Sequence, residues 1–392
     1  MAGRNEMERR LTVLGTYYNP NGGYTIQTWD SYFKLFSQKI EKHYNENRQT
    51  RKELEEKLTI LEEIEEYLEE NVFDKPIRGI QYELKAVVPF GSSAGALGMK
   101  GGDLDMILCV YPPLDPSQED AIKSRTNSIL KRIFKKIENG NMMEDREWED
   151  MEHRDEARVP IITGTVDGID IDISISMTEG VSAQYLAAKY IDTYAKYDRR
   201  FILLTAFIKA WQKKMKTEEN EKLYDKVFPK SCCVVLMVVL FMKHYGMLPN
   251  INKKHEDKLS NIRATWERVN GGEDGSFGVE NKSAGDWKLS NKNSVSLGTL
   301  FLLFIDFYTR VVDFKIEKLV VEYGTFVRKN FNQRTDQIVI EDVLDKNNPV
   351  SFLQQSKRNN QELSTTEDIQ AIDGVEAQMT ADDIQKLQKL RY

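Results

Sequence analysis

The stretch VVPFGSSAGALGMKGGDLDMILCV, residues 87–110, decides the fold. Two apolar runs typical of β-strands flank a Gly–Ser–Ser turn (residues 91–93), and the second run opens with Asp103 and Asp105. Residues two apart on a strand point to the same face, so these two carboxylates face the same way and repel each other. We therefore expect a positive charge between them, or a strand end that is open to water.

A second acidic strand lies further along the chain. The stretch RVPIITGTVDGIDIDISIS, residues 158–176, is typical of a β-hairpin with its turn at Asp167–Gly168. Asp170 and Asp172 alternate with isoleucines, so both carboxylates face one side of the strand. If the two acidic strands are neighbours, their aspartates form a site for Mg²⁺, which prefers carboxylate oxygens and substrate phosphates. Two such metals suit in-line nucleotidyl transfer. The structural alternative is a set of solvated aspartates at the rim of a sheet.

The composition indicates a soluble, intracellular protein of two domains. Its 392 residues exceed what one hydrophobic core usually covers, and 40% hydrophobic with 30% charged residues is ordinary for globular proteins. Three cysteines, an odd number, favour reduced thiols over a disulfide framework. No signal peptide is visible, and the longest apolar run, residues 232–242, is too short to cross a bilayer. We therefore expect a cytoplasmic protein with no membrane segment.

Helical periodicity accounts for much of the remaining chain. We predict helices over residues 31–40, 51–70, 117–137, 200–216, 231–245 and 297–311. In the second of these, leucines and isoleucines recur every three or four residues, and its Glu and Lys residues are expected to form the solvated side. Four other stretches lack this periodicity: residues 1–28, 142–157, 270–286 and those after 350. We expect the first two to lie exposed on the surface, the third to be a loop and the last a disordered or weakly helical tail.

Six motifs in order resemble one enzyme family. FGSSAGALGMKGGDLDM resembles the G-S…D-h-D signature of the DNA polymerase β-like nucleotidyltransferase superfamily, in which h is an apolar residue. Five later motifs are similar to those of its terminal uridylyltransferase-like group, the template-independent poly(A) and poly(U) polymerases: DIDISIS, YAKYDRRFILLTAFIKAWQKKM, SCCVVLMVVLFMKHYGMLPNI, SLGTLFLLFIDFYTRVVDF and IVIEDVLDKNNPV. The ordered matches span Phe33 to Val350, most of the chain, and together they are specific for the group.

This resemblance implies a two-lobed α+β nucleotidyltransferase with the active site in a cleft between the lobes. Residues 72–183 would form the catalytic domain, with a mixed β-sheet. Residues 31–71 together with 184–350 would form the helical central domain. Residues 1–30 and 351–392 would be terminal tails.

The resemblance also implies roles for individual residues. Asp103 and Asp105 match the aspartates that hold both metals, Mg²⁺ or Mn²⁺. Asp172 matches the third carboxylate, which helps the first metal activate the RNA 3′-hydroxyl, and Asp170 is the other candidate on that strand. Six further residues would bind the triphosphate: Gly91, Ser92, Ser93, Lys209, Lys213 and Ser231. Without the resemblance, the two lysines, four residues apart, would be read as a solvated helix face.

Departures from the family pattern leave base identity open. Gly102 stands where the family usually has a serine, Ala187-Ala188 replaces the Asn-Thr pair that contacts the ribose, and Cys232 replaces the aromatic that stacks on the base. The histidine of uridine-selective members is absent from the stretch around Asn347-Asn348. Addition of A, of U, or of a mixture such as UG by a poly(UG) polymerase of the nematode type therefore all stay open.

The expected function is the addition of ribonucleotides to single-stranded RNA 3′ ends without a template. A catalytically silent scaffold is one alternative, although the complete set of three aspartates argues against it. A synthase of small nucleotide products, like the oligoadenylate synthase-like relatives, is another. No dedicated RNA-binding module is visible and the net charge is −7, so we expect weak RNA binding and a recruiting protein partner. From the resemblance we also expect a location in ribonucleoprotein granules and a role in RNA silencing.

Overall fold

The protein is described here by a computed structural model, which covers residues 2–16, 21–115, 117–140, 142–143, 145–157, 159–177, 183–215, 229–253, 277–278, 294–329, 339–341 and 350–351. Met1–Phe352 form one compact unit. The predicted tail, beyond Ser351, lies outside the described residues. Most of the predicted loop 270–286 lies outside them too.

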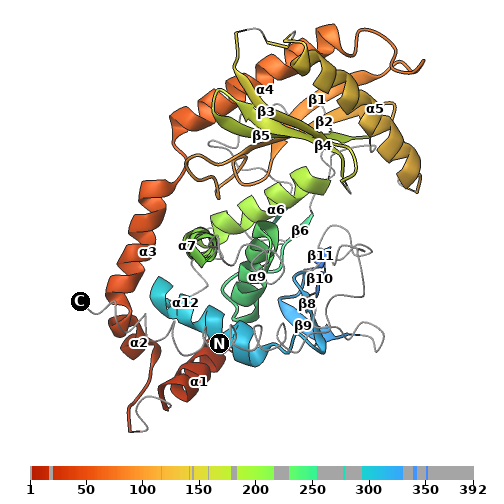
Figure 1. Ribbon diagram of the computed structural model, residues 1–392. Helices are drawn as coiled ribbons and strands as arrows, with labels where there is room; N and C mark the ends of the chain where they lie inside the picture. The colour runs from red at the N-terminus through yellow and green to blue at the C-terminus, as the bar shows by residue number, and fades with distance from the viewer. Residues whose placement is uncertain are drawn as a thin grey trace, which may run out of the picture. The chain divides into compact units, whose positions relative to one another are not determined.

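A mixed five-stranded sheet has the order β1-β2-β5-β4-β3 (Figure 1). Its strands are β1 (Glu83–Phe90), β2 (Leu104–Tyr111), β3 (Trp148–Arg154), β4 (Ile161–Val166) and β5 (Ile169–Ser176). β2 and β5 are parallel, and the other neighbours are antiparallel. The predicted hairpin is confirmed as β4–β5, and its turn residues Asp167 and Gly168 have φ angles of 50° and 75°, which a type I′ turn requires. The expected α+β fold is likewise confirmed.

Two helices share a hydrophobic core with one face of the sheet. They are α4 (Arg51–Asn71) and α5 (Glu119–Glu138), whose buried isoleucines and leucines pack in one cluster with β1, β2, β4 and β5. Thr50 caps the start of α4. Its side chain accepts a hydrogen bond from the backbone N–H of Glu53, and the Glu53 side chain accepts one from the backbone N–H of Thr50, which is a capping box. Strand residues alternate faces, so every second residue of β2 and β5 is left for the opposite side.

Helix α6 packs on that opposite side. α6 (Ala183–Tyr197) contributes the buried Tyr185 to a small cluster with residues of β1 and β2, among them Val88 and Ile107. Asp105 lies two residues before Ile107 and therefore belongs to the same face of β2. The carboxylates predicted to be catalytic thus lie on the side of the sheet that faces α6, away from the core formed with α4 and α5.

A second hydrophobic core is mainly helical. It is formed by the second half of α6 and by α1 (Ala2–Thr16), α2 (Ile26–Tyr32), α3 (Lys34–Asn47), α7 (Arg199–Met215), α9 (Ser231–His244), α12 (Leu297–Asp306) and the π-helix η2 (Phe307–Val311). A four-stranded sheet in the order β11-β10-β8-β9 adjoins it, made of β8 (Glu317–Val320), β9 (Thr325–Arg328), β10 (Val339–Glu341) and β11 (Val350–Ser351). A further pair, β6 (Asn252–Lys253) and β7 (Phe277–Gly278), is antiparallel. Within the described residues, no helix is both long and apolar enough to cross a membrane.

Three expectations about the surface and the layers differ from the structure. Residues 2–16 do not lie loosely on the surface: they form α1, whose Met7 and Leu11 are fully buried in the helical core. Part of the acidic stretch 142–157 forms the edge strand β3, paired with β4. Of residues 31–71, α3 joins the helical core as expected, whereas α4 joins the core of the sheet. The domain boundaries themselves stay a prediction.

Candidate active site

The turn after β1 brings Gly91 against the first acidic strand. β1 and β2 are antiparallel with Phe90 opposite Asp105, so the chain leaves β1 beside the start of β2. Gly91 has a φ of 72°, and a Cβ built on it would lie 1.9 Å from Asp105 Oδ2. Any side chain here would be strained and would displace the carboxylate, so both the backbone angle and the close approach require glycine.

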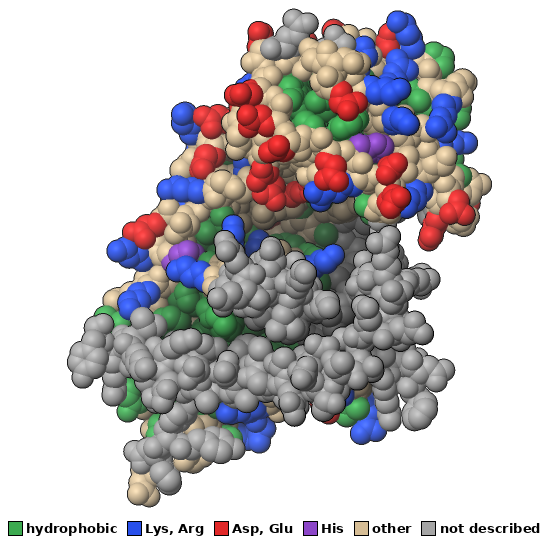
Figure 2. Space-filling model, in the orientation of Figure 1, with side chains coloured by type: hydrophobic (Ala, Val, Ile, Leu, Met, Phe, Trp, Pro, Cys, Tyr) green, Lys and Arg blue, Asp and Glu red, His purple; other side chains and the backbone are tan. Residues whose placement is uncertain are grey.

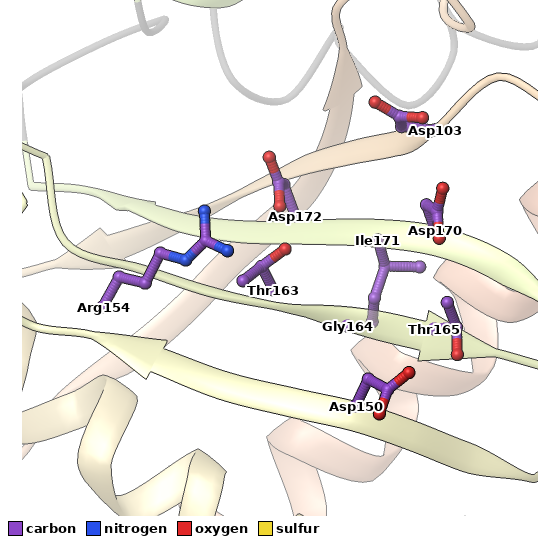
Figure 3. A pocket seen from close by; sticks show the side chains of 9 residues that line it. All are labelled: Asp103, Asp150, Arg154, Thr163, Gly164, Thr165, Asp170, Ile171 and Asp172. Atoms are coloured by element: carbon purple, nitrogen blue, oxygen red, sulfur yellow. The ribbon is translucent and has the colours of Figure 1, made fainter. Parts of the chain in front are cut away.

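Parallel pairing brings the two acidic strands together. Asp105 and Asp172 are register partners on β2 and β5. Figure 3 shows Asp103, Asp170 and Asp172 at one side of a pocket whose volume is about 350 Å³. The pocket extends from these carboxylates across β4 to the edge strand β3, where Arg154 lies beside it. The site is therefore a row of aspartates at one end of an open, polar surface of the sheet.

The carboxylates are desolvated and repel one another. Burial, followed by the negative charges of Asp172 and Asp103, raises the pKa of Asp105 to about 7. Burial and the neighbouring aspartates also raise the pKa of Asp103. The positive charge of Lys57 acts to lower the pKa of both carboxyl groups, and the charge of Lys209 acts to lower the pKa of Asp105. Such mutual repulsion is typical of a site that receives a cation.

The arrangement fits a divalent cation by the chemistry of its donors. Asp103, Asp105 and Asp172 offer hard oxygen atoms, and none of them forms an ion pair with another described residue. Yet across the described part of the chain, no three His, Cys, Asp or Glu side chains stand together as a set of metal ligands. The strand pairing sets the backbones side by side, so the carboxylates would have to turn toward one another to share an ion.

The residues predicted to bind the triphosphate are brought together only in part. Lys209 is close enough to act on Asp105, and its own pKa is lowered by burial, while Asp103, Cys232 and Asp105 act to raise it. Cys232 follows Ser231 at the start of α9, where both are exposed. Lys213 is exposed one helical turn beyond Lys209, and the structure records no contact between it and the aspartates. The triphosphate role of these residues stays a prediction.

Ser93 has internal partners that the sequence did not predict. It is 3% exposed, its hydroxyl donates to the backbone oxygen of Asp103, and it accepts a hydrogen bond of 2.8 Å from Lys57 Nζ. Ser92 is half-buried and precedes it in the turn. Ser92 is therefore better placed than Ser93 to offer its hydroxyl to a ligand.

Sequence reasoning missed two contributors to the site. The expectation that the Lys and Glu residues of helix 51–70 are solvated is wrong for Lys57 and Glu65, which are 3% and 8% exposed. A signal was present, because Lys57 lies three residues after one apolar position of the helix and four before another, Leu54 and Leu61. Arg154 lay within a stretch expected to be an exposed insertion, and only the pairing of β3 with β4 places it beside the pocket.

Comparison with protein families and solved structures identifies this arrangement. Residues 36–192 match the family described as poly(A) RNA polymerase, mitochondrial-like, central palm domain. Among curated proteins, none matches the chain.

Solved structures extend the similarity to most of the chain. The mtPAP structure in complex with GTP is 18% identical, with a TM-score of 0.58 over 88% of this chain and 66% of its own. The chain therefore spans about two thirds of mtPAP. The GLD-2/RNP-8 complex is 19% identical, with a TM-score of 0.53 over 79% of this chain and 91% of its own.

The poly(U) polymerase Cid1, crystallised with Mg and 3′-dATP, is 21% identical, with a TM-score of 0.50 over 79% of this chain and 85% of its own. These identities are low, so the solved structures show the fold alone, and the family model matches less than half of the chain. The resemblance seen in the motifs is confirmed: the chain has the fold of a poly(A)- and poly(U)-polymerase-like nucleotidyltransferase, and residues 36–192 match the model of a central palm domain.

Proposed function

We propose that the protein adds ribonucleotides to the 3′ ends of single-stranded RNA without a template, releasing pyrophosphate. The observation that supports this most is the register of β2 and β5, which pairs Asp105 with Asp172 next to the Gly91 turn. A phosphate held by the turn would lie beside carboxylates that can hold cations, and nucleotidyl transfer needs this juxtaposition. The known fold and palm domain favour the same reaction class.

Asp103, Asp105 and Asp172 are the residues that would hold Mg²⁺ or Mn²⁺. Such ions, when bound, neutralise charge on the transferring phosphoryl group and favour ionisation of the attacking hydroxyl. The chain itself supplies the backbone N–H groups of residues 91–93, which can bind an anion at a turn of this kind by donating hydrogen bonds to it. Lys209 adds a positive charge within reach of the aspartates.

The pocket over β4 and β3 is our candidate for the RNA end. In-line displacement places the attacking and leaving groups on opposite sides of the reacting phosphorus. The Gly91 turn borders the aspartates from β1, whereas the pocket borders them from β4 and β3. If the turn takes the triphosphate, the terminal nucleotide belongs on the other side, where Arg154 offers a charge for its phosphate.

Base identity requires its own test. The mtPAP fold has been crystallised with GTP, UTP, CTP and ATPγS. That range, together with Cys232 and Ala187-Ala188 at the positions where the family pattern has its base and ribose contacts, leaves A, U and mixed tails such as UG as candidates for this chain. Sequencing of tails made from an equal mixture of the four triphosphates decides among them.

A protein partner that supplies RNA targets is part of the proposal. On the face in Figure 2, Lys and Arg side chains of the described residues are scattered among Asp and Glu side chains. Such a surface offers few phosphate contacts, so RNA binding should be weak and its affinity should depend little on the salt concentration. The structure of the GLD-2/RNP-8 complex is a precedent for a protein partner on this fold. We also propose a cytoplasmic location in ribonucleoprotein granules, which fluorescence microscopy would test, and a role in RNA silencing, which a silencing assay in cells that lack the protein would test.

Primer extension tests the function. Purified protein is incubated with or without single-stranded RNA, with Mg²⁺ or Mn²⁺, and with each nucleoside triphosphate in turn, labelled at its α-phosphate. We expect ladders of longer RNA that require the primer. Labelled products formed equally without RNA would favour a small-nucleotide synthase, and absence of any transfer with all four nucleotides would favour a silent scaffold.

A further inference from the structure

Lys57 of α4 is a buried cation beneath the loop that joins the two sides of the site. Its side chain is almost fully enclosed, at 3% exposure. Its Nζ donates hydrogen bonds to Gln49 Oε1 at 2.8 Å, to Ser93 Oγ at 2.8 Å and to the backbone oxygen of Gly102. An ammonium group has three donors, so each of them has an acceptor.

These contacts join both ends of the loop between β1 and β2. Ser93 lies at the start of the loop, in the turn, and Gly102 lies at its end, immediately before Asp103. The Ser93 hydroxyl also donates to the backbone oxygen of Asp103, so Lys57 and Ser93 form a continuous chain of hydrogen bonds to the acidic strand. The middle of the loop is held separately, by Tyr44 and Asp192 at Ala96. Gln49 also donates to the backbone oxygens of Ser93 and Gly98, so Lys57 and Gln49 together tie the turn to the residues just before Asp103.

The charge of Lys57 has no direct ion-pair partner among the described residues. Its three acceptors are neutral oxygens, and burying a cation without a paired anion is costly. The nearest carboxylates that act on it belong to Glu53, Asp103 and Asp105. Of these, Glu53 is engaged with Thr50 in the helix cap. A methionine would fill the same space at a lower cost if packing were the only requirement.

We infer that Lys57 is a positioning residue, which fixes the triphosphate turn relative to Asp103 and Asp105 and offsets part of their charge. This inference rests on the proposed function, since it assigns the turn to a triphosphate. It predicts that the loss of the ammonium group loosens residues 91–102 and weakens binding of a polyphosphate. The sheet and its core with α4 would stay intact.

The test compares Lys57→Met with Lys52→Met. Lys52 lies on the same helix, and its ion pair with Glu56 is exposed, so its removal should change neither the site nor the fold. Binding of tripolyphosphate with Mg²⁺ is measured by calorimetry, because this probe carries no base. Hydrogen exchange of the backbone reports the order of the loop. For Lys57→Met we expect at least a tenfold weaker affinity and faster exchange confined to residues 91–102, with β1 and β2 still protected.

Wild-type affinity and loop exchange in a folded Lys57→Met protein would overturn the inference. Uniformly faster exchange in sheet and loop, with unchanged affinity, would also overturn it, because that outcome describes a packing role alone. If Lys57→Met does not fold, Ser93→Ala cuts the same chain of hydrogen bonds with a smaller change, and the same two outcomes apply. A wild-type protein that binds tripolyphosphate and extends no RNA would refute the proposed function while leaving the role of Lys57 in place.

Discussion

Asp105 is held at the centre of the site by its backbone position, although its charge opposes folding. It lies between Gly91 on one side and Asp172 on the neighbouring strand. Burial and the adjacent aspartates raise its pKa to about 7, so an ionised carboxylate is costly in the folded protein. A residue that costs stability in this way is typical of a functional site.

Asp105→Asn should therefore stabilise the metal-free protein while abolishing nucleotide addition. The folded pKa lies above the ordinary value of 3.8, so the cost is fully present above about pH 7 and disappears as the pH falls toward about 4. We expect a gain in the free energy of unfolding on the order of 1 kcal/mol at about pH 8, and little change at about pH 4. Urea unfolding in the presence of a chelator measures both. A loss of stability at the higher pH would contradict the account.

Asp172 and Asp170 provide a matched pair for the third carboxylate. Asp172 is the register partner of Asp105, whereas Asp170 lies two residues earlier on the same face. We expect Asp172→Asn to reduce nucleotide addition by about a hundredfold or more, in the range of a lost charge-stabilising group, with nucleotide binding retained. Asp170→Asn should be milder. The reverse order in steady-state kinetics would show that Asp170 is the third carboxylate.

At the scale of single elements, the apolar strands could be predicted from sequence. β1, β2 and β4 are short runs rich in apolar residues, and β5 alternates strictly and follows the β4–β5 turn, so local pattern alone is sufficient. The edge strand β3 could not be predicted, because its residues are mostly polar and one edge has no strand partner. α1 was missed because its three buried apolar residues are set in a polar segment. Its Arg10 also pairs with a residue 296 positions away, Asp306, which no local pattern indicates.

That partner gives a prediction for α1. Arg10 donates two hydrogen bonds to Asp306 of α12, at 2.8 and 2.7 Å, and the Asp306 side chain is fully buried. Arg10→Met should lower the free energy of unfolding by about 3 kcal/mol, because the buried Asp306 loses both short hydrogen bonds and keeps only its longer ion pair with Arg310, at 3.7 Å. Arg9→Met is the control, since the Arg9–Glu6 pair is exposed and its loss should change the stability little. Equal effects of the two substitutions in chemical unfolding would show that α1 is not anchored by this pair.

α9 contains a second buried cation, which makes stability depend on pH. Lys243 donates to the backbone oxygens of Val321 and Glu322, and burial lowers its pKa to about 7. The unfolded chain binds more protons than the folded one between about pH 7 and about pH 10, so stability should rise with pH in this window. The slope contributed by Lys243 is at most about 1.4 kcal/mol per pH unit and should be absent in Lys243→Met. Parallel pH profiles of the two proteins would contradict the assignment.

At the scale of the whole molecule, the sequence predicted which elements exist better than which layers they join. The apolar face of α4 indicated an amphipathic helix, but such a face does not specify whether it packs on a sheet or on other helices. The structure places it on the sheet, where Lys57 can reach the loop of the active site. The site aspartates were found because strand alternation and family motifs agree on them. Lys57 and Arg154 were missed because each depends on a tertiary contact.

If Asp103, Asp105 and Asp172 catalyse nucleotidyl transfer to RNA, pyrophosphate release and primer extension must be coupled. Both are measured together, for the wild-type protein and for Asp105→Asn, with all four nucleoside triphosphates and Mn²⁺ or Mg²⁺. We expect one pyrophosphate released for each nucleotide added to RNA by the wild-type protein, and a rate at least about a hundredfold lower for the folded variant. Equal rates for the two proteins, or a folded wild-type protein that extends RNA with none of the nucleotides, would contradict this assignment.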